Sequence, residues 1–133
     1  MPRPPRSRFA AGLLVTLLAC AAGWSAGARA EDDAHAIARL RAEIEKTRDL
    51  RCTNVSFCRI LPMGADACGN PTSWIAFNNA PDIKEILETK ASEVTFIEED
   101  RFRGKPKPTD CKAAKPPKLA CINSRCVIGD LSY

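Results

Sequence analysis

The 133-residue chain contains a single histidine, His35. Any nucleophile–base arrangement would have to use this single imidazole. The sequence also lacks a C-x-x-C pair and a glycine-rich phosphate-binding loop. Carboxylate pairs such as Glu43–Glu45 and Glu98–Glu99 fall at positions expected to be hydrophilic, where nothing would separate their pKa values. These absences disfavour an enzyme and predict neither a cofactor nor a bound metal.

Long apolar runs are also lacking. The longest, Phe9–Ala22, is shorter than the roughly 20 residues that a spanning helix needs. It follows three arginines and precedes Ala28-Arg29-Ala30, an A-x-A cleavage motif, so residues 1–30 are predicted to be a signal peptide. Leu17-Leu18-Ala19-Cys20 resembles a bacterial lipobox, in which Cys20 would be lipidated. We favour soluble export to the periplasm or beyond, with a lipid anchor at Cys20 as the alternative.

Without the predicted leader, the chain carries no net charge. The leader holds four of the 20 basic residues and none of the 16 acidic ones, so the remainder is neutral. The basic pI is therefore no argument for a nucleic-acid partner. The remaining charges are divided, because residues 31–100 carry net −6 and residues 101–133 carry net +6. Such a division predicts attraction between the two parts of the fold.

Cysteine is what the chain has in quantity. Roughly 100 residues follow the leader, and a domain of this size hides only about 60–65% of its unfolded surface. Small exported domains commonly compensate with disulfides, each contributing about 2–4 kcal/mol. We therefore expect three disulfides among the six cysteines after the leader, which are Cys52, Cys58, Cys68, Cys111, Cys121 and Cys126.

Sequence alone does not fix how these cysteines pair. The predicted set joins Cys52 to Cys58 and Cys121 to Cys126 locally, and Cys68 to Cys111 at long range. The last pair has the best support, because both cysteines flank turns and a long helix separates them. Zinc is the competing use of thiols, but the ligand spacing disfavours it.

Apolar spacings of three and four residues predict two helices. Residues 31–50 form an N-terminal helical segment, which either packs on the body or stays a loosely attached arm. A longer helix begins at Pro81 and ends near residue 101, before Gly104. Three β-prone stretches complete the pattern: 57–62, 73–78, and a hairpin over 118–128 that turns at Asn123-Ser124.

The predicted fold class is α+β: a small disulfide-stapled antiparallel sheet with one long covering helix and an N-terminal helix. The expected divisions are a signal peptide over 1–30, the helical segment over 31–50, and the stapled domain over 51–133. The proline- and lysine-rich stretch 104–118 is interpreted as a solvated connection held at its centre by Cys111. The alternative for this stretch is a cationic patch for an anionic envelope polymer or an acidic protein.

The spacing C-x5-C-R-[IV]-L-x-x-G-x-x-x-CG-x-P, then a long helix, then C…C-x4-C, is carried here by residues 52–126. It resembles a group of small uncharacterised exported proteins and lipoproteins of Gram-negative bacteria. The resemblance covers about residues 50–128 and implies a shared scaffold, with no activity or site residue. Because many members are lipoproteins, it adds weight to lipidation of Cys20.

These observations favour a non-enzymatic periplasmic or envelope module that binds another protein, whose identity the sequence does not give. The alternative is a secreted inhibitor of a hydrolase that presents a rigid disulfide-held loop, either 62–72 or 104–117, because rigid loops lose little entropy on docking. No nucleic-acid partner is expected, and the membrane is a partner only if Cys20 is lipidated.

Overall fold

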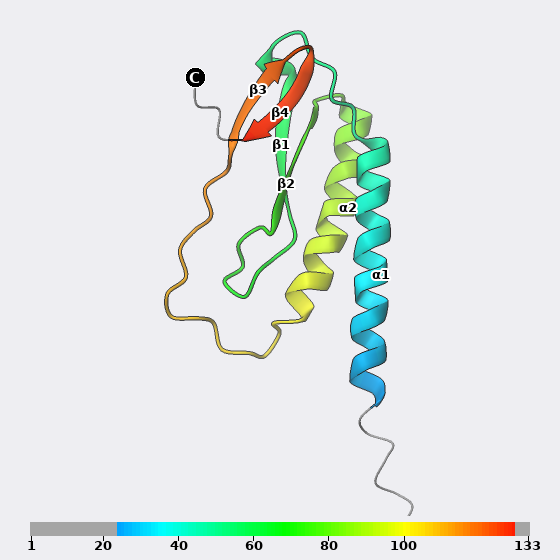
Figure 1. Cartoon of the computed structure of the whole chain (residues 1–133), viewed down its shortest axis with the longest axis vertical. Coiled ribbons are helices and arrows are strands. Elements are labelled where there is room, and N and C mark those ends of the chain that lie inside the picture. The colour runs from blue at the N-terminus through cyan, green and yellow to red at the C-terminus, as the bar shows by residue number, and fades with distance from the viewer. Residues whose placement is uncertain (1–23, 130–133) are drawn as a thin grey trace, which may run out of the picture.

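The computed structural model describes residues 24–129, which are arranged in three layers (Figure 1). Two antiparallel helices form the first layer, a two-stranded ribbon forms the second, and a small hairpin forms the third. The elements are α1 (Trp24–Thr47), η1 (Val55–Phe57), β1 (Cys58–Met63), β2 (Ser73–Asn78), α2 (Pro81–Asp100), β3 (Lys118–Ile122) and β4 (Arg125–Gly129). The α+β class is thereby confirmed.

Helix α1 begins earlier than the sequence predicted. It starts at Trp24 and runs through Ala28-Arg29-Ala30, the predicted cleavage motif, because this alanine-rich stretch has high helix propensity. The side chains of residues 27–30 are exposed, and Arg29 forms an ion pair of 3.0 Å with Asp100 at the end of α2. The rest of the predicted leader, including Cys20, lies outside the described residues.

Helix α1 packs on the body through its apolar stripe. Ile37, Leu40 and Ile44 are all buried, and Ile44 is only 1% exposed. They share one core cluster with Leu87 and Val94 of α2. Of the two possibilities that the sequence left open, the packed helix is therefore correct and the loose arm is wrong.

The β1–β2 ribbon is apolar on both faces, and this places it in the middle. Met63, Ile75 and Phe77 on one face join the core cluster with the helices. Cys58 and Ala76 on the other face pack in a second cluster with residues of the β3–β4 hairpin. The residues of a strand alternate between faces, so a single short ribbon serves two cores.

The strands form two separate antiparallel sheets, and the expectation of one sheet is wrong. The strand positions themselves agree with the sequence prediction, as does the turn at Asn123 and Ser124, which both have positive φ. Strand β4 does not pair with the ribbon, because the segment before η1 already pairs with β4 along the edge that β3 leaves free. Cys126 N–H donates to Leu50 O at 2.7 Å, and Cys52 N–H donates to Ser124 O at 3.1 Å.

The disulfides are Cys52–Cys121, Cys58–Cys126 and Cys68–Cys111. Only the long-range pair was predicted correctly, and both local pairs are wrong. Cys121 and Cys126 are cross-strand neighbours in the hairpin, so their side chains project from the same face. That face lies against the ribbon, and each sulfur bonds across the layer boundary instead of along the hairpin.

Three disulfides indicate an oxidising compartment, extracellular or periplasmic. In residues 24–129, no helix combines the length and apolarity that crossing a bilayer requires.

Replacement of Ile44 by Ala tests the attachment of α1. We expect the free energy of unfolding to fall by about 2–5 kcal/mol, because a fully buried side chain is lost from between the two helices. Urea denaturation of the oxidised protein measures it. Lys46→Ala, at an exposed position of the same helix, should change it by less than about 0.5 kcal/mol. Equal effects of the two substitutions would contradict the packing of α1.

Candidate functional site

The candidate site is a pair of loops at the end of the molecule where α1 begins and α2 ends (Figure 1). The first loop, residues 64–72, connects the two strands of the ribbon, and the second, residues 101–117, leads from α2 to β3. The Cys68–Cys111 disulfide joins them directly. We refer to residues 64–72 and 101–117 as the loop pair.

A buried carboxylate anchors the first loop to both helices. Glu98 of α2 is only 7% exposed. Its Oε1 accepts a hydrogen bond from Arg41 of α1 at 3.0 Å. Its Oε2 accepts from Ala65 N–H at 2.9 Å and from the Thr72 hydroxyl at 2.8 Å. One side chain therefore fixes both ends of the 64–72 loop and the neighbouring helix.

Gly64 makes this close approach possible. A Cβ at this position would lie 1.9 Å from Thr72 Oγ1 and 2.4 Å from Glu98 Oε2. Its φ of +80° is also one that other residues adopt at a cost. The backbone N–H of Gly64 donates to Thr95 Oγ1 at 2.9 Å, which adds a second tie to α2.

Asp66 and Asn70 order the rest of the first loop and extend the contact to the second. The Asp66 carboxylate accepts from the backbone N–H groups of Asn70 and Cys68, both at 2.8 Å. These bonds, that from Asn70 foremost, hold the pKa of Asp66 below its ordinary value. The Asn70 side chain donates to Lys112 O and accepts from Ala114 N–H, both at 2.9 Å.

The second loop is basic and faces solvent. Residues 101–117 contain six basic residues and one acidic one, and all seven of these side chains are exposed. Arg103 lies 3.0 Å from Asp100 and over the ring of Phe96, whereas Lys105 lies over the ring of Phe102. Within residues 24–129, no carboxylate forms an ion pair with Lys105 or Lys107.

The two loops enclose an open hollow of about 550 Å³. Its walls carry both signs of charge and one aromatic ring. They are formed by Asp66, Ala67 and Gly69 from the first loop, Glu99 from α2, and Phe102, Arg103, Lys105 and Lys107 from the second loop. The arrangement can receive an anionic group from solvent, with two unpaired ammonium groups beside it.

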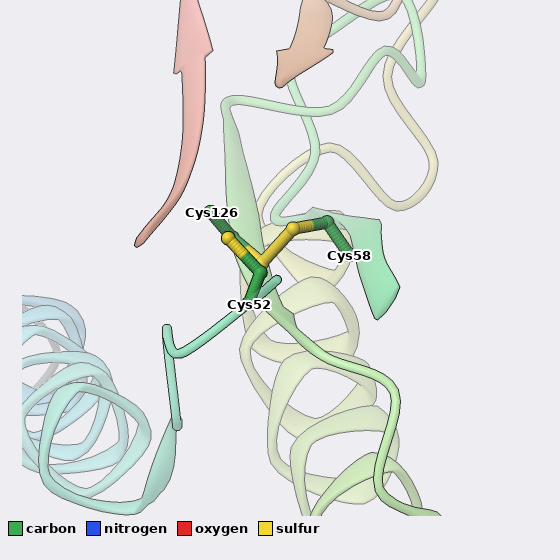
Figure 2. A group of neighbouring side chains, drawn as sticks. All are labelled: Cys52, Cys58 and Cys126. Atoms are coloured by element: carbon green, nitrogen blue, oxygen red, sulfur yellow. A yellow bond between two sulfur atoms is a disulfide. The ribbon is translucent and has the colours of Figure 1, made fainter. Parts of the chain in front are cut away.

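A second cysteine cluster lies at the opposite end, where the layers meet. The sulfur atoms of Cys52, Cys58 and Cys126 lie within 4.8 Å of one another, and Figure 2 shows the three side chains converging. Metal ligation requires thiolates, and each of these sulfurs is bonded to another sulfur. The cluster therefore belongs to two adjacent disulfides, which join the hairpin to β1 and to the segment before η1, and its role is structural.

The remaining residues singled out by sequence are dispersed. His35 is exposed on α1. Glu43 pairs with Lys90 of α2, and this hydrogen bond lowers the pKa of Glu43. The expectation that Glu98 occupies a hydrophilic position is wrong, because loop 64–72 folds over it. The sequence did carry a signal for the burial of Glu98, which lies four residues after Val94 and seven after Ala91, both of them buried.

Comparison with known proteins gives no relative for this chain. No protein-family model matches the sequence, and no match emerged among curated proteins or solved structures.

Alanine at Gly64 and at Gly69 separates the close approach from backbone strain. Both glycines have a φ near +80°, so each substitution should cost about 1–2 kcal/mol in stability. Around Gly69 a Cβ meets only Lys107 Nζ at 3.8 Å, an ordinary contact. We expect Gly64→Ala to cost about 1–3 kcal/mol more than Gly69→Ala, because it displaces Thr72 and Glu98. Indistinguishable urea midpoints would contradict the Glu98 anchor.

Protonation of Asp66 should loosen the first loop at low pH. Its pKa is lowered in the fold, so the stabilising hydrogen bonds are present above the ordinary value and are lost as pH falls through the lowered one. We expect the NMR amide shifts of Cys68 and Asn70 to titrate together, with a midpoint below 3.8. Asp66→Asn should abolish this step. A midpoint at or above 3.8 would show that the carboxylate is not held as described.

Proposed function

We propose that this protein is a non-enzymatic binding module of the periplasm or envelope, and that the loop pair binds an acidic face of another protein. The observation that carries the proposal is the cross-link between the exposed second loop and the partly buried first loop, made by Cys68–Cys111 and by both ends of the Asn70 amide. Loops held in this way are already in one conformation before a partner arrives.

Preorganisation favours binding because it removes a cost of association. Ordering an exposed side chain on docking costs about 0.5–1.5 kcal/mol, and a free loop adds a backbone cost for each residue. In the loop pair, Glu98 fixes the first loop to the helices and Asn70 fixes the centre of the second loop to the first. Most of the ordering is therefore complete in the unbound protein.

The charge of the second loop favours an acidic partner. Six cations along residues 101–117, Lys105 and Lys107 among them, make the second loop itself basic, with the carboxylates of Asp66, Glu99 and Asp100 beside it. Cations on an exposed loop accelerate encounter with a negatively charged surface, and the effect weakens as salt is added. The stretch is also solvated and held at Cys111, as the connection interpretation expected, and the proposal adds a binding role for its lysines.

The finer location belongs to the same proposal. The leader pattern of residues 1–30 and the resemblance to exported Gram-negative proteins favour the periplasm. A lipid on Cys20 is the alternative form, and it would attach the same body to a membrane. The absence of catalysis is also part of the proposal: the loop pair contains no histidine, and His35 is exposed on α1.

Inhibition of a hydrolase is the second candidate function. The observation that favours it is the short 64–72 loop, which is fixed at both ends by Glu98 and at its tip by Cys68. An inhibitor inserts a rigid loop of this kind into an active site and loses little entropy on docking. This function requires that the dominant partner be a hydrolase and that its turnover fall on binding.

Charge reversal at the hollow tests the proposed surface. We expect Lys105→Glu with Lys107→Glu to reduce capture of the periplasmic partner by about tenfold, because two attractive charges become repulsive at the interface. Affinity capture from periplasmic extract, quantified by mass spectrometry at two salt concentrations, measures it. The matched control is Lys46→Glu with Lys84→Glu, which makes the same charge change on exposed positions of α1 and α2.

The outcomes separate the candidate functions. A partner that is captured by the control protein, lost with the double reversal and released by salt supports the acidic-protein proposal. A captured hydrolase whose activity falls in proportion to added protein supports inhibition instead. Equal capture by both double variants would show that the loop pair is not the binding surface.

A further inference from the structure

The three disulfides differ in their access to solvent. Cys58 and Cys126 are 1% and 2% exposed, so the bond between them is enclosed by the second core cluster. In the Cys52–Cys121 bond, Cys52 is 6% exposed and Cys121 is half-buried. Cys111 is exposed and Cys68 is half-buried, so Cys68–Cys111 is the disulfide with an exposed cysteine. A thiol in solution can therefore approach this bond in the folded protein more readily than the other two.

Few other interactions hold the second loop in place. Every residue from 103 to 116 is exposed, and within the described chain the ties from residues 106–116 to the first loop are the disulfide and the two hydrogen bonds of Asn70. Opening this one bond would release the stretch between α2 and β3. The helices, the ribbon and the hairpin would keep their cores and both of their own cross-links.

A lysine and a carboxylate adjoin each of these cysteines. Lys112 follows Cys111 and Asp110 precedes it; Lys107 Nζ lies beside Gly69, the residue after Cys68, and the Cys68 N–H donates to Asp66. Thiol–disulfide exchange proceeds through thiolates, both as the attacking group and as the leaving group, and cations that neighbour them stabilise them. The exposure of Cys111 is therefore what favours exchange at this bond.

We propose that Cys68–Cys111 is a site of thiol–disulfide exchange, at which a dithiol reductant opens the loop pair while the rest of the fold stays intact. A thiolate of the reductant attacks the exposed Cys111 sulfur, the bond to Cys68 breaks, and Cys68 leaves as a thiolate that takes a proton. The second thiol of the reductant then displaces Cys111 from the mixed disulfide. The reductant ends as a disulfide, and Cys68 and Cys111 end as two thiols.

Opening the bond would regulate binding, and this part of the inference rests on the proposed function. With the bond reduced, the second loop must be ordered when the partner docks, so the entropic cost that the cross-link removes returns. The oxidised protein would bind its acidic partner and the reduced protein would bind it more weakly. The exchange chemistry itself can be measured without any partner.

The test is a timed reduction of the full-length oxidised protein with dithiothreitol. Samples are quenched with N-ethylmaleimide at intervals, and the labelled cysteines are mapped by peptide mass spectrometry. We expect a species with two labels to accumulate, with both labels on Cys68 and Cys111, and with a half-time at least about tenfold shorter than for the other four cysteines. Its circular dichroism should match that of the oxidised protein.

A variant with Cys68→Ser and Cys111→Ser supplies the second measurement. It should fold with two disulfides, and amide hydrogen exchange should quicken in residues 104–117 and stay unchanged in α1 and the ribbon. Simultaneous labelling of all six cysteines, or first labelling at Cys58 or Cys126, would overturn the exchange proposal. Selective labelling of Cys68 and Cys111, together with undiminished capture of the partner by the protein in which this bond is reduced, would support the exchange site. It would count against the loop pair as the binding surface.

Discussion

The two disulfides that fasten the β3–β4 hairpin, one to strand β1 and one to the segment before η1, are the constraint on which the rest of the structure depends. A two-stranded hairpin is marginally stable in water, and this one leaves most of its side chains half-buried or exposed. Cys52–Cys121 and Cys58–Cys126 close sequence separations of 69 and 68 residues, for which chain-entropy arguments give about 4 kcal/mol each. They hold a third layer over the outer face of the ribbon. They also bring the ends of the segment that contains α2 and the loop pair to one place.

Glu98 determines how the loops sit on this frame. The Arg41–Glu98 ion pair is only partly buried, with 42% of the Arg41 side chain exposed, and the desolvation of Glu98 offsets much of its attraction. The role of Glu98 here is to fix the positions of its neighbours. Its carboxylate accepts from Arg41 of α1 and from two donors of the 64–72 loop, so a shift of α1 along α2 would leave polar groups unpaired. The geometry of the loop pair is thus tied to the packing of the helices, although the loops themselves are exposed.

Sequence patterns predicted the elements better than the connections between them. Strand positions, the long helix and the Cys68–Cys111 disulfide followed from local periodicity and turn residues. The other two disulfides did not, because Cys121 and Cys126 are adjacent in the hairpin and only the layer facing them decides which sulfurs they meet. The burial of Glu98 was missed for a related reason, since a loop distant in sequence covers it. The disulfide that joins the two loops was therefore predicted, whereas the Asn70 hydrogen bonds and the Glu98 anchor that complete the loop pair are tertiary properties.

The position of helix α1 would determine how a lipid-anchored form of the protein is oriented at a membrane. Cys20 precedes Trp24, where the helix begins, by a few residues that span at most about 14 Å when extended. A lipid on Cys20 would thus act as a very short tether joined to a rigid rod. Helix α1 begins at the same end of the molecule as the basic loop, because Arg29 forms an ion pair with Asp100, the residue directly before that loop. A lipidated form would have little reach away from the bilayer, and the basic loop 101–117 would lie on the side of the molecule nearest that surface.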